Sequence, residues 1–142
     1  MKNNAIGMVL VLGAASVCAL DAQSVNSPFS AKVPFTFQVG SQAFAAGKYV
    51  VGQHGYLGVP TIQNAVTGQT LFVAGANHAL TRSGPPRLVF HCYAGKTCFL
   101  AEIQPPAGSG SVIAMTKAEK ALANGDRTGE MATISVDIRK AD

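Results

Sequence analysis

Beyond residue 30, hydrophobic and polar residues alternate over several short stretches, which is the pattern of β-strands that bury one face. The alternation is strict over 33–39 and 131–138. The segment 87–104 has the pattern of two strands folded back on each other around Gly95, and it is the most apolar stretch after the N-terminal 22 residues. Further strands are predicted over 48–53, 56–63, 69–74 and 111–115.

Two prolines limit these strands. Pro34 cannot donate a backbone hydrogen bond, so the strand over 33–39 should begin at a sheet edge or at its first pair. Gly58 and Pro60 interrupt the segment 56–63, which predicts an irregular or bulged strand there.

One helix is predicted after the N-terminal segment, over 117–124. Thr116 is followed three residues later by Glu119, which is a capping box: each side chain can bond the backbone amide of the other residue. Gly125 is suited to the left-handed residue that closes a helix.

About eight strands and one short helix, joined by short turns, predict an all-β fold that is mostly antiparallel. Strands at this spacing are typical of a small barrel or a β-sandwich rather than a parallel α/β sheet. A length of 142 residues suits one domain, which we expect over 31–142.

The first 22 residues have the pattern of a secretory signal peptide. Lys2 supplies a positive start, and the run 5–20 is apolar apart from Ser16. Signal peptidase could cleave after Ala22 or after Ala19, because a small residue precedes each bond. The sequence therefore predicts a chain exported to the periplasm or the extracellular space.

The sequence disfavours two alternatives to a cleaved signal. A membrane anchor is disfavoured because the apolar run is about 15 residues long, whereas a span needs about 20, so we expect no membrane span after cleavage. A lipoprotein anchored through Cys18 is disfavoured because Val17 stands where a lipobox has a small residue. The expected organisation is a signal over 1–22, a flexible leader over 23–30, and the β domain.

Composition narrows the range of partners. Only 13% of residues are charged, against about 25% in an average soluble domain. The net charge is +4, but the positive residues are scattered and only Arg139 and Lys140 are adjacent, so a nucleic-acid partner is not expected. The small polar surface suggests that a protein or a small apolar ligand covers part of one face.

Two cysteines remain after signal cleavage. If the hairpin is symmetric about Gly95, Cys92 lies opposite Cys98, at a separation that suits a disulfide. A two-residue turn at Gly95 would offset the pair, whereas a three- or five-residue loop aligns it. A disulfide is favoured in an oxidising compartment, with buried free thiols as the alternative. A redox or zinc site is disfavoured because the spacing is not that of a CxxC motif.

The same register places Glu102 opposite Leu88, on an apolar face of the hairpin. A carboxylate there must be paired, exposed at the sheet end, or altered in pKa. Arg87 lies diagonal to it, so we expect a structural ion pair between Glu102 and Arg87. A catalytic acid would need a second titrating group nearby, and the sequence identifies none.

No cofactor, metal or catalytic residue is predicted. The histidines lack the short spacing of a zinc motif, and His91 is expected to pack on the hairpin face; they are His54, His78 and His91. The chain contains no nucleophile elbow, no phosphate-binding glycine loop and no zinc-protease motif.

Two parts of the sequence resemble a group of small exported bacterial β-proteins. The segment VPFTFQVG over 33–40 and AGKYVV over 46–51 are similar to the VPFxFxVG strand and PAGxYxV turn of that group. LVFH over 88–91 and FLAEI over 99–103, followed by the helix, are similar to its later LVFHRY…FLxEV hairpin. The motifs occur in the same order in both.

The resemblance implies a fold and export, but no chemistry, because the group has no assigned activity. Two positions depart from its pattern. Ala46 stands where the group has proline, and Cys92 and Cys98 are not general in it, so a disulfide would be particular to this chain.

From the sequence we expect an exported, non-catalytic β-domain that acts as a binding module or an envelope-associated structural module. The alternative is a carrier with an apolar cavity inside a closed barrel, which would need a cavity of at least ~300 Å³. An enzyme, such as a hydrolase, is a weaker alternative because it would need groups such as His91 and Glu102 to converge in a cleft.

Overall fold

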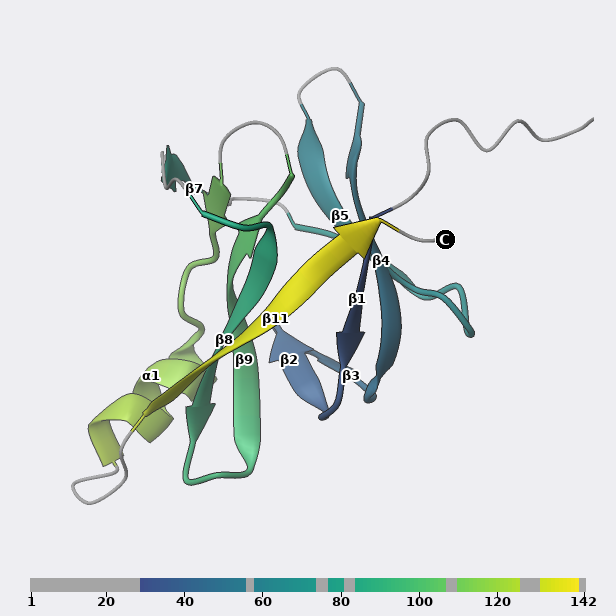
Figure 1. Ribbon diagram of the computed structural model, residues 1–142. Coiled ribbons are helices and arrows are strands. Elements are labelled where there is room, and N and C mark those ends of the chain that lie inside the picture. Colours follow the sequence, from purple (N-terminus) through teal and green to yellow (C-terminus); the bar gives the residue numbers. More distant parts are fainter. Residues whose placement is uncertain are drawn as a thin grey trace, which may run out of the picture.

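A computed structural model describes residues 29–55, 58–73, 77–80, 84–106, 110–125 and 131–140 (Figure 1). The predicted signal peptide over 1–22, with Cys18 and both cleavage positions, lies outside the described residues. So do residues 23–28 of the expected leader.

The described chain forms eleven strands and one helix. The strands are β1 (Phe29–Val33), β2 (Phe37–Val39), β3 (Gln42–Phe44), β4 (Gly47–His54), β5 (Val59–Asn64), β6 (Thr70–Phe72), β7 (Asn77–Leu80), β8 (Arg87–Tyr93), β9 (Thr97–Gln104), β10 (Gly110–Val112) and β11 (Ala132–Lys140). The helix is α1 (Lys117–Gly125).

All strands belong to one curled sheet that forms a half-barrel (Figure 1). Its order is β3-β2-β9-β8-β11-β1-β4-β5-β6, with β10 pairing both β9 and β7. Strands β2 and β9 run parallel, and every other pairing among the described strands is antiparallel. The all-β prediction with one short helix is confirmed, although the sheet is mixed and has more strands than expected.

Strand β11 joins the two halves of the sheet. Its first six residues pair with β8, from Ala132 opposite Cys92 to Asp137 opposite Arg87. Its last three residues pair with β1 on the other side. The diagonal course of β11 in Figure 1 follows from this change of partner.

The core lies on the concave side of the sheet and is rich in aromatic rings. The ring of Phe37 on β2 lies 5.1 Å from that of Tyr49 on β4 and 5.1 Å from that of Phe90 on β8. Strands β2 and β8 lie on one side of β11 in the strand order, and β4 lies on the other. The ring cluster therefore holds these two halves of the sheet together. All three residues are at most 1% exposed.

Pro34 divides the strand predicted over 33–39. The chain leaves β1 after Val33 and re-enters the sheet at Phe37, now beside β9. The expected alternation still holds at Val33, Phe37 and Val39, which are buried. Strand β1 also begins at Phe29, so the last two residues of the leader predicted over 23–30 belong to the sheet.

The other strand predictions are mostly confirmed, with two strands missed. Strands β3 and β7 lie in segments for which no strand was predicted. Strand β5 is regular rather than bulged: Gly58 lies in the preceding turn, and Pro60 pairs directly with Gln53. Gly125 is the last residue of α1, and its φ is not positive, in contrast to the expected left-handed closure.

The β8–β9 hairpin has the predicted register at its tip but not along its length. Cys92 lies opposite Cys98, and Phe90 opposite Leu100. The register then shifts, which leaves Ala101 as an extra residue and places Glu102 opposite Val89 instead of Leu88. The shift returns Ile103 to the buried core, which symmetric pairing would have placed on the opposite face.

Candidate functional site: an apolar cavity at the end of the half-barrel

A cavity of about 380 Å³ lies between the two walls of the curled sheet. Its lining comes from β1, β4 and β5 on one wall and from β9, β10 and the segment after β9 on the other. The lining residues are Phe29, Val51, Gly52, Gln53, Pro60, Ile103, Pro105, Pro106 and Ser111.

Strand register explains the first wall. Phe29 on β1 lies directly opposite Val51 on β4, so their side chains share the concave face. Gln53 comes two residues after Val51 and therefore points to the same side. Pro60 on β5 lies directly opposite Gln53 and continues this surface.

The second wall is built around Ile103. On one side Ile103 pairs with Leu88 of β8, and on the other it pairs with Ser111 of β10. Strand β9 ends at Gln104, and Pro105 and Pro106 then line the cavity. Neither proline has a backbone N–H, so this part of the rim offers no backbone hydrogen-bond donor and its side chains are apolar.

The cavity can bind but has no groups for acid–base chemistry. Among the described residues that line it, none titrates, and the polar side chains are Gln53 and Ser111. A mostly apolar cavity with a few polar groups is the usual form of a site for a small organic ligand, and the volume lies within the ~300–1,000 Å³ range of such sites.

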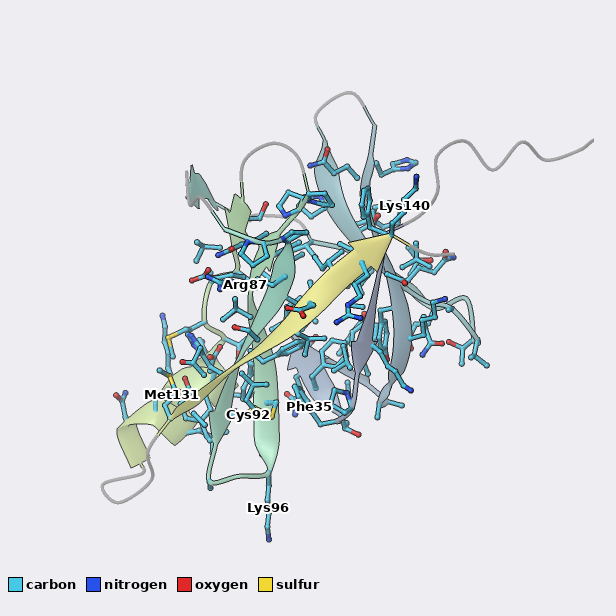
Figure 2. All side chains as sticks on the ribbon, viewed as in Figure 1. Phe35, Arg87, Cys92, Lys96, Met131 and Lys140 are labelled. Carbon is cyan, nitrogen blue, oxygen red and sulfur yellow. A yellow bond between two sulfur atoms is a disulfide. The ribbon has the colours of Figure 1, made fainter. Side chains whose placement is uncertain are left out.

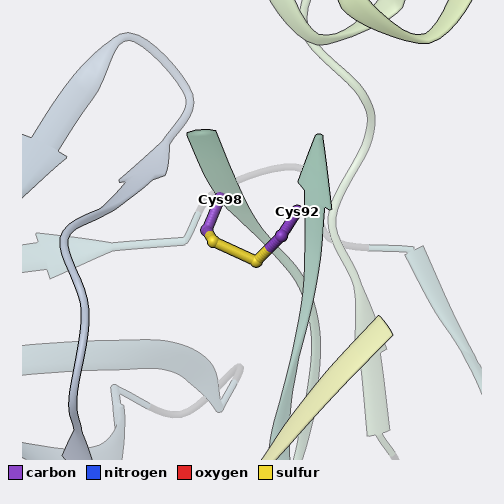
Figure 3. The surroundings of a disulfide bond; sticks show 2 residues. All are labelled: Cys92 and Cys98. Carbon is purple, nitrogen blue, oxygen red and sulfur yellow. A yellow bond between two sulfur atoms is a disulfide. The ribbon is translucent and has the colours of Figure 1, made fainter. Parts of the chain in front are cut away.

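The disulfide predicted at the hairpin tip is present. Figure 3 shows the bond between Cys92 and Cys98, whose Cα atoms lie 4.0 Å apart. The three-residue loop Ala94–Lys96 aligns the pair, as the symmetric register requires. At the end of this loop Lys96 points away from the body of the protein (Figure 2).

The structure places Arg87 and Glu102 on neighbouring strands but does not show the expected ion pair. Among the described residues, neither of the two ion pairs joins them. Glu102 accepts a hydrogen bond of 3.1 Å from Nε2 of Gln104, and Arg87 lies directly opposite Gln104. The register shift at Ala101 places Glu102 on the same face of the hairpin as Arg87, so the register itself does not account for this difference.

The capping box is half formed. The amide of Glu119 donates to Oγ1 of Thr116 at 3.1 Å, as predicted. The carboxylate of Glu119 instead accepts a bond of 3.1 Å from the Tyr93 hydroxyl. Burial raises the pKa of Tyr93, and the charge and hydrogen bond of Glu119 raise it further. Helix α1 is thereby fixed to the face of β8 opposite the core.

His91 belongs to the same cluster. Its Nδ1 atom lies 3.7 Å from Oε1 of Glu119, and within the described part of the chain this buried nitrogen has no hydrogen-bond partner. The ring of His54 packs edge-on against Phe72 at 5.2 Å. The side chain of His78 lies outside the described residues. No three His, Cys, Asp or Glu side chains that the structure describes form a group able to hold a metal ion.

Sequence reasoning did not identify the residues that line the cavity or the Tyr93–Glu119 bond. In the sequence, Pro105 and Pro106 indicate only the end of the strand that precedes them, and Pro60 indicates only an interruption. Their apolar character was visible in the sequence, but their convergence depends on pairings between distant segments.

Comparison with known protein families, curated proteins and solved structures finds no match for this chain. Within the described residues, no helix is both long enough and apolar enough to cross a membrane.

Proposed function

We propose that this chain is a non-catalytic binding domain that takes a small, uncharged apolar ligand into the cavity between β4–β5 and β9–β10. The observation that carries this proposal is the cavity itself, with its volume of about 380 Å³ and no titratable group among the described residues that line it. The sequence-based alternative was a carrier with an apolar cavity inside a closed barrel. The half-barrel offers a cavity of sufficient volume without being closed.

The proposal favours binding over catalysis because of where the titratable side chains lie. Neither His91 nor Glu102 lines the cavity, so the convergence that a hydrolase would need there does not occur. The Glu119 carboxylate bonds the buried Tyr93 hydroxyl beneath α1. That cluster holds the helix on the sheet, which is a structural role.

We further propose that the domain acts after export, in the periplasm or outside the cell. The Cys92–Cys98 disulfide supports this location, because disulfides persist in oxidising compartments. The signal-like pattern over 1–22 and the resemblance to small exported proteins support the same location.

A binding titration tests the proposed site. The purified chain is titrated with N-phenyl-1-naphthylamine, a neutral apolar dye whose fluorescence rises when it leaves water. We expect saturable binding by the wild type, and at least about tenfold weaker binding by Val51→Phe, because the larger ring occupies the cavity. Val50→Phe is the matched control, since Val50 is the neighbouring residue on the opposite face of β4.

Equal affinities of Val51→Phe and the wild type would refute the cavity as the binding site. So would equal losses in both variants, because the effect would then not depend on the face of β4. A thermal melt of each variant shows that any loss occurs in a folded protein.

A further inference from the structure

A second feature lies on β11, where the strand changes partner. Beyond the pair Ala31–Ile138, no described pairing joins β1 to β11, and residues 132–137 of β11 pair only with β8. The two strands enclose a notch, which we define by its lining: Ser30, Lys32, Lys48, Val136, Asp137 and Arg139. Its volume is about 450 Å³.

One side of the notch is a strand edge with free backbone groups. The amide of Ile138 donates to the carbonyl of Pro86 at 3.0 Å, on the β8 side. In an antiparallel strand, alternate residues direct their N–H and C=O groups to opposite edges. Ser135 and Thr133 therefore direct theirs toward the notch, where no strand of the described chain pairs with them. Both residues are exposed.

The outer side of the notch is positively charged. Lys32 lies directly opposite Lys48 on the neighbouring strand, an arrangement that like charges make unfavourable. Arg139 adds a third cation, and Asp137, at 3.7 Å from it, is the one carboxylate among the described lining residues. An anionic group placed here would relieve the repulsion between the lysines.

The inner side of the notch is apolar. Ile134 is on the same face as the core residue Phe90, directly opposite it, yet it is 36% exposed. Val136, two residues further on, is half-buried against the core. Ala132 and Ile134 occupy apolar positions of the alternating pattern over 131–138, yet both are exposed because no described strand covers this part of the edge.

A strand added to this edge would have two different faces. Every second side chain would lie beside Ile134 and Val136, and the intervening side chains would lie beside Lys32 and Arg139. We propose that the notch binds an extended peptide segment of a partner protein in which acidic and apolar residues alternate, by adding it to β11 as a further strand. This site shares no residue with the cavity, so the proposal is independent of the apolar ligand.

A synthetic octapeptide of alternating glutamate and valine, labelled for fluorescence anisotropy, tests the proposal. We expect Ser135→Pro to weaken binding at least about tenfold, because proline removes the N–H that faces the notch while leaving the β8 ladder intact. Ser135→Ala keeps the backbone group and should bind as the wild type does. Circular dichroism shows whether the proline variant is folded.

Charge reversal gives a test that does not depend on the proline variant. The double variant Lys32→Glu, Lys48→Glu should lose the glutamate–valine peptide and bind a lysine–valine octapeptide instead. The proposal is overturned if the wild type binds the lysine–valine peptide equally well, or if a peptide of the same composition with four glutamates followed by four valines binds equally. A folded Ser135→Pro variant that binds the peptide as tightly as the wild type would also overturn the proposal. So would dimerisation of the chain through this edge that excludes the peptide.

Discussion

The Tyr93 hydroxyl donates a hydrogen bond of 3.1 Å to the carboxylate of Glu119, and this bond joins helix α1 to strand β8 across 26 residues of chain. Both side chains are buried. The helix-capping hydrogen bond uses the backbone of the same residue, because the amide of Glu119 donates to Oγ1 of Thr116. One residue thus serves both the helix terminus and the attachment of the helix to the sheet.

Replacing Tyr93 with Phe should destabilise the protein by about 1.5 to 3 kcal/mol, because the buried carboxylate loses a hydrogen-bond donor. Urea unfolding at neutral pH measures the change. In a Glu119→Gln background the same substitution should cost clearly less, since the charged acceptor is already gone. An equal cost in both backgrounds would show that the loss does not come from this bond.

The raised pKa of Tyr93 predicts a stability loss at high pH. Burial is the main cause of the raised value, followed by the charge of Glu119 and its hydrogen bond. The unfolded chain releases the Tyr93 proton near pH 10, while the folded chain still holds it. The stabilisation is therefore complete below about pH 10 and is lost as the pH rises toward the folded pKa. Urea unfolding from pH 8 to 11 should show the advantage of the wild type over Tyr93→Phe shrinking above pH 10, and a constant advantage would contradict this.

The Cys92–Cys98 disulfide closes a short loop, so its removal should cost only about 2 kcal/mol. The measurement compares unfolding of the wild type and of Cys92→Ala, Cys98→Ala, with and without reductant. Reductant should affect only the wild type. Two titratable thiols per denatured chain in the absence of reductant would contradict the disulfide.

The hairpin tip contains a residue in an unfavourable backbone conformation. Ala94 has φ 51°, in the left-handed region that favours glycine, and Gly95 follows with φ 66°. We expect Ala94→Gly to stabilise the protein by about 0.5 kcal/mol, because the relief of strain exceeds the added entropy of the unfolded chain. Gly95→Ala should destabilise it by about 1 kcal/mol. Thermal unfolding of both variants gives the signs, and matching signs would contradict the account.

Local patterns predicted much of the fold because alternation records which face of a strand is buried. The hairpin around Gly95 and the final strand were identified in this way. Pro34 was recognised as a constraint, but the sequence could not show that the chain changes from one half of the sheet to the other there. Strands β3 and β7 were missed because neither Gln42–Phe44 nor Asn77–Leu80 alternates between polar and apolar residues.

The candidate site was less predictable because it depends on register. The extra residue at Ala101 moved Glu102 from its expected position opposite Leu88 to a position opposite Val89, on the other face of the hairpin. The cavity brings Phe29 and Ile103 together from strands far apart in the chain. Neither relationship leaves a pattern in local sequence.

The central claim is that an apolar ligand occupies the cavity between the sheet walls. Its most direct test is an NMR titration of the methyl-labelled chain with N-phenyl-1-naphthylamine. The account predicts that the methyl signals of Val51 and Ile103 shift and saturate together, while those of Val89, on the opposite face of the sheet, do not move. Saturable shifts at Val89 without shifts at Val51 and Ile103, or no saturable shifts at all, would contradict it.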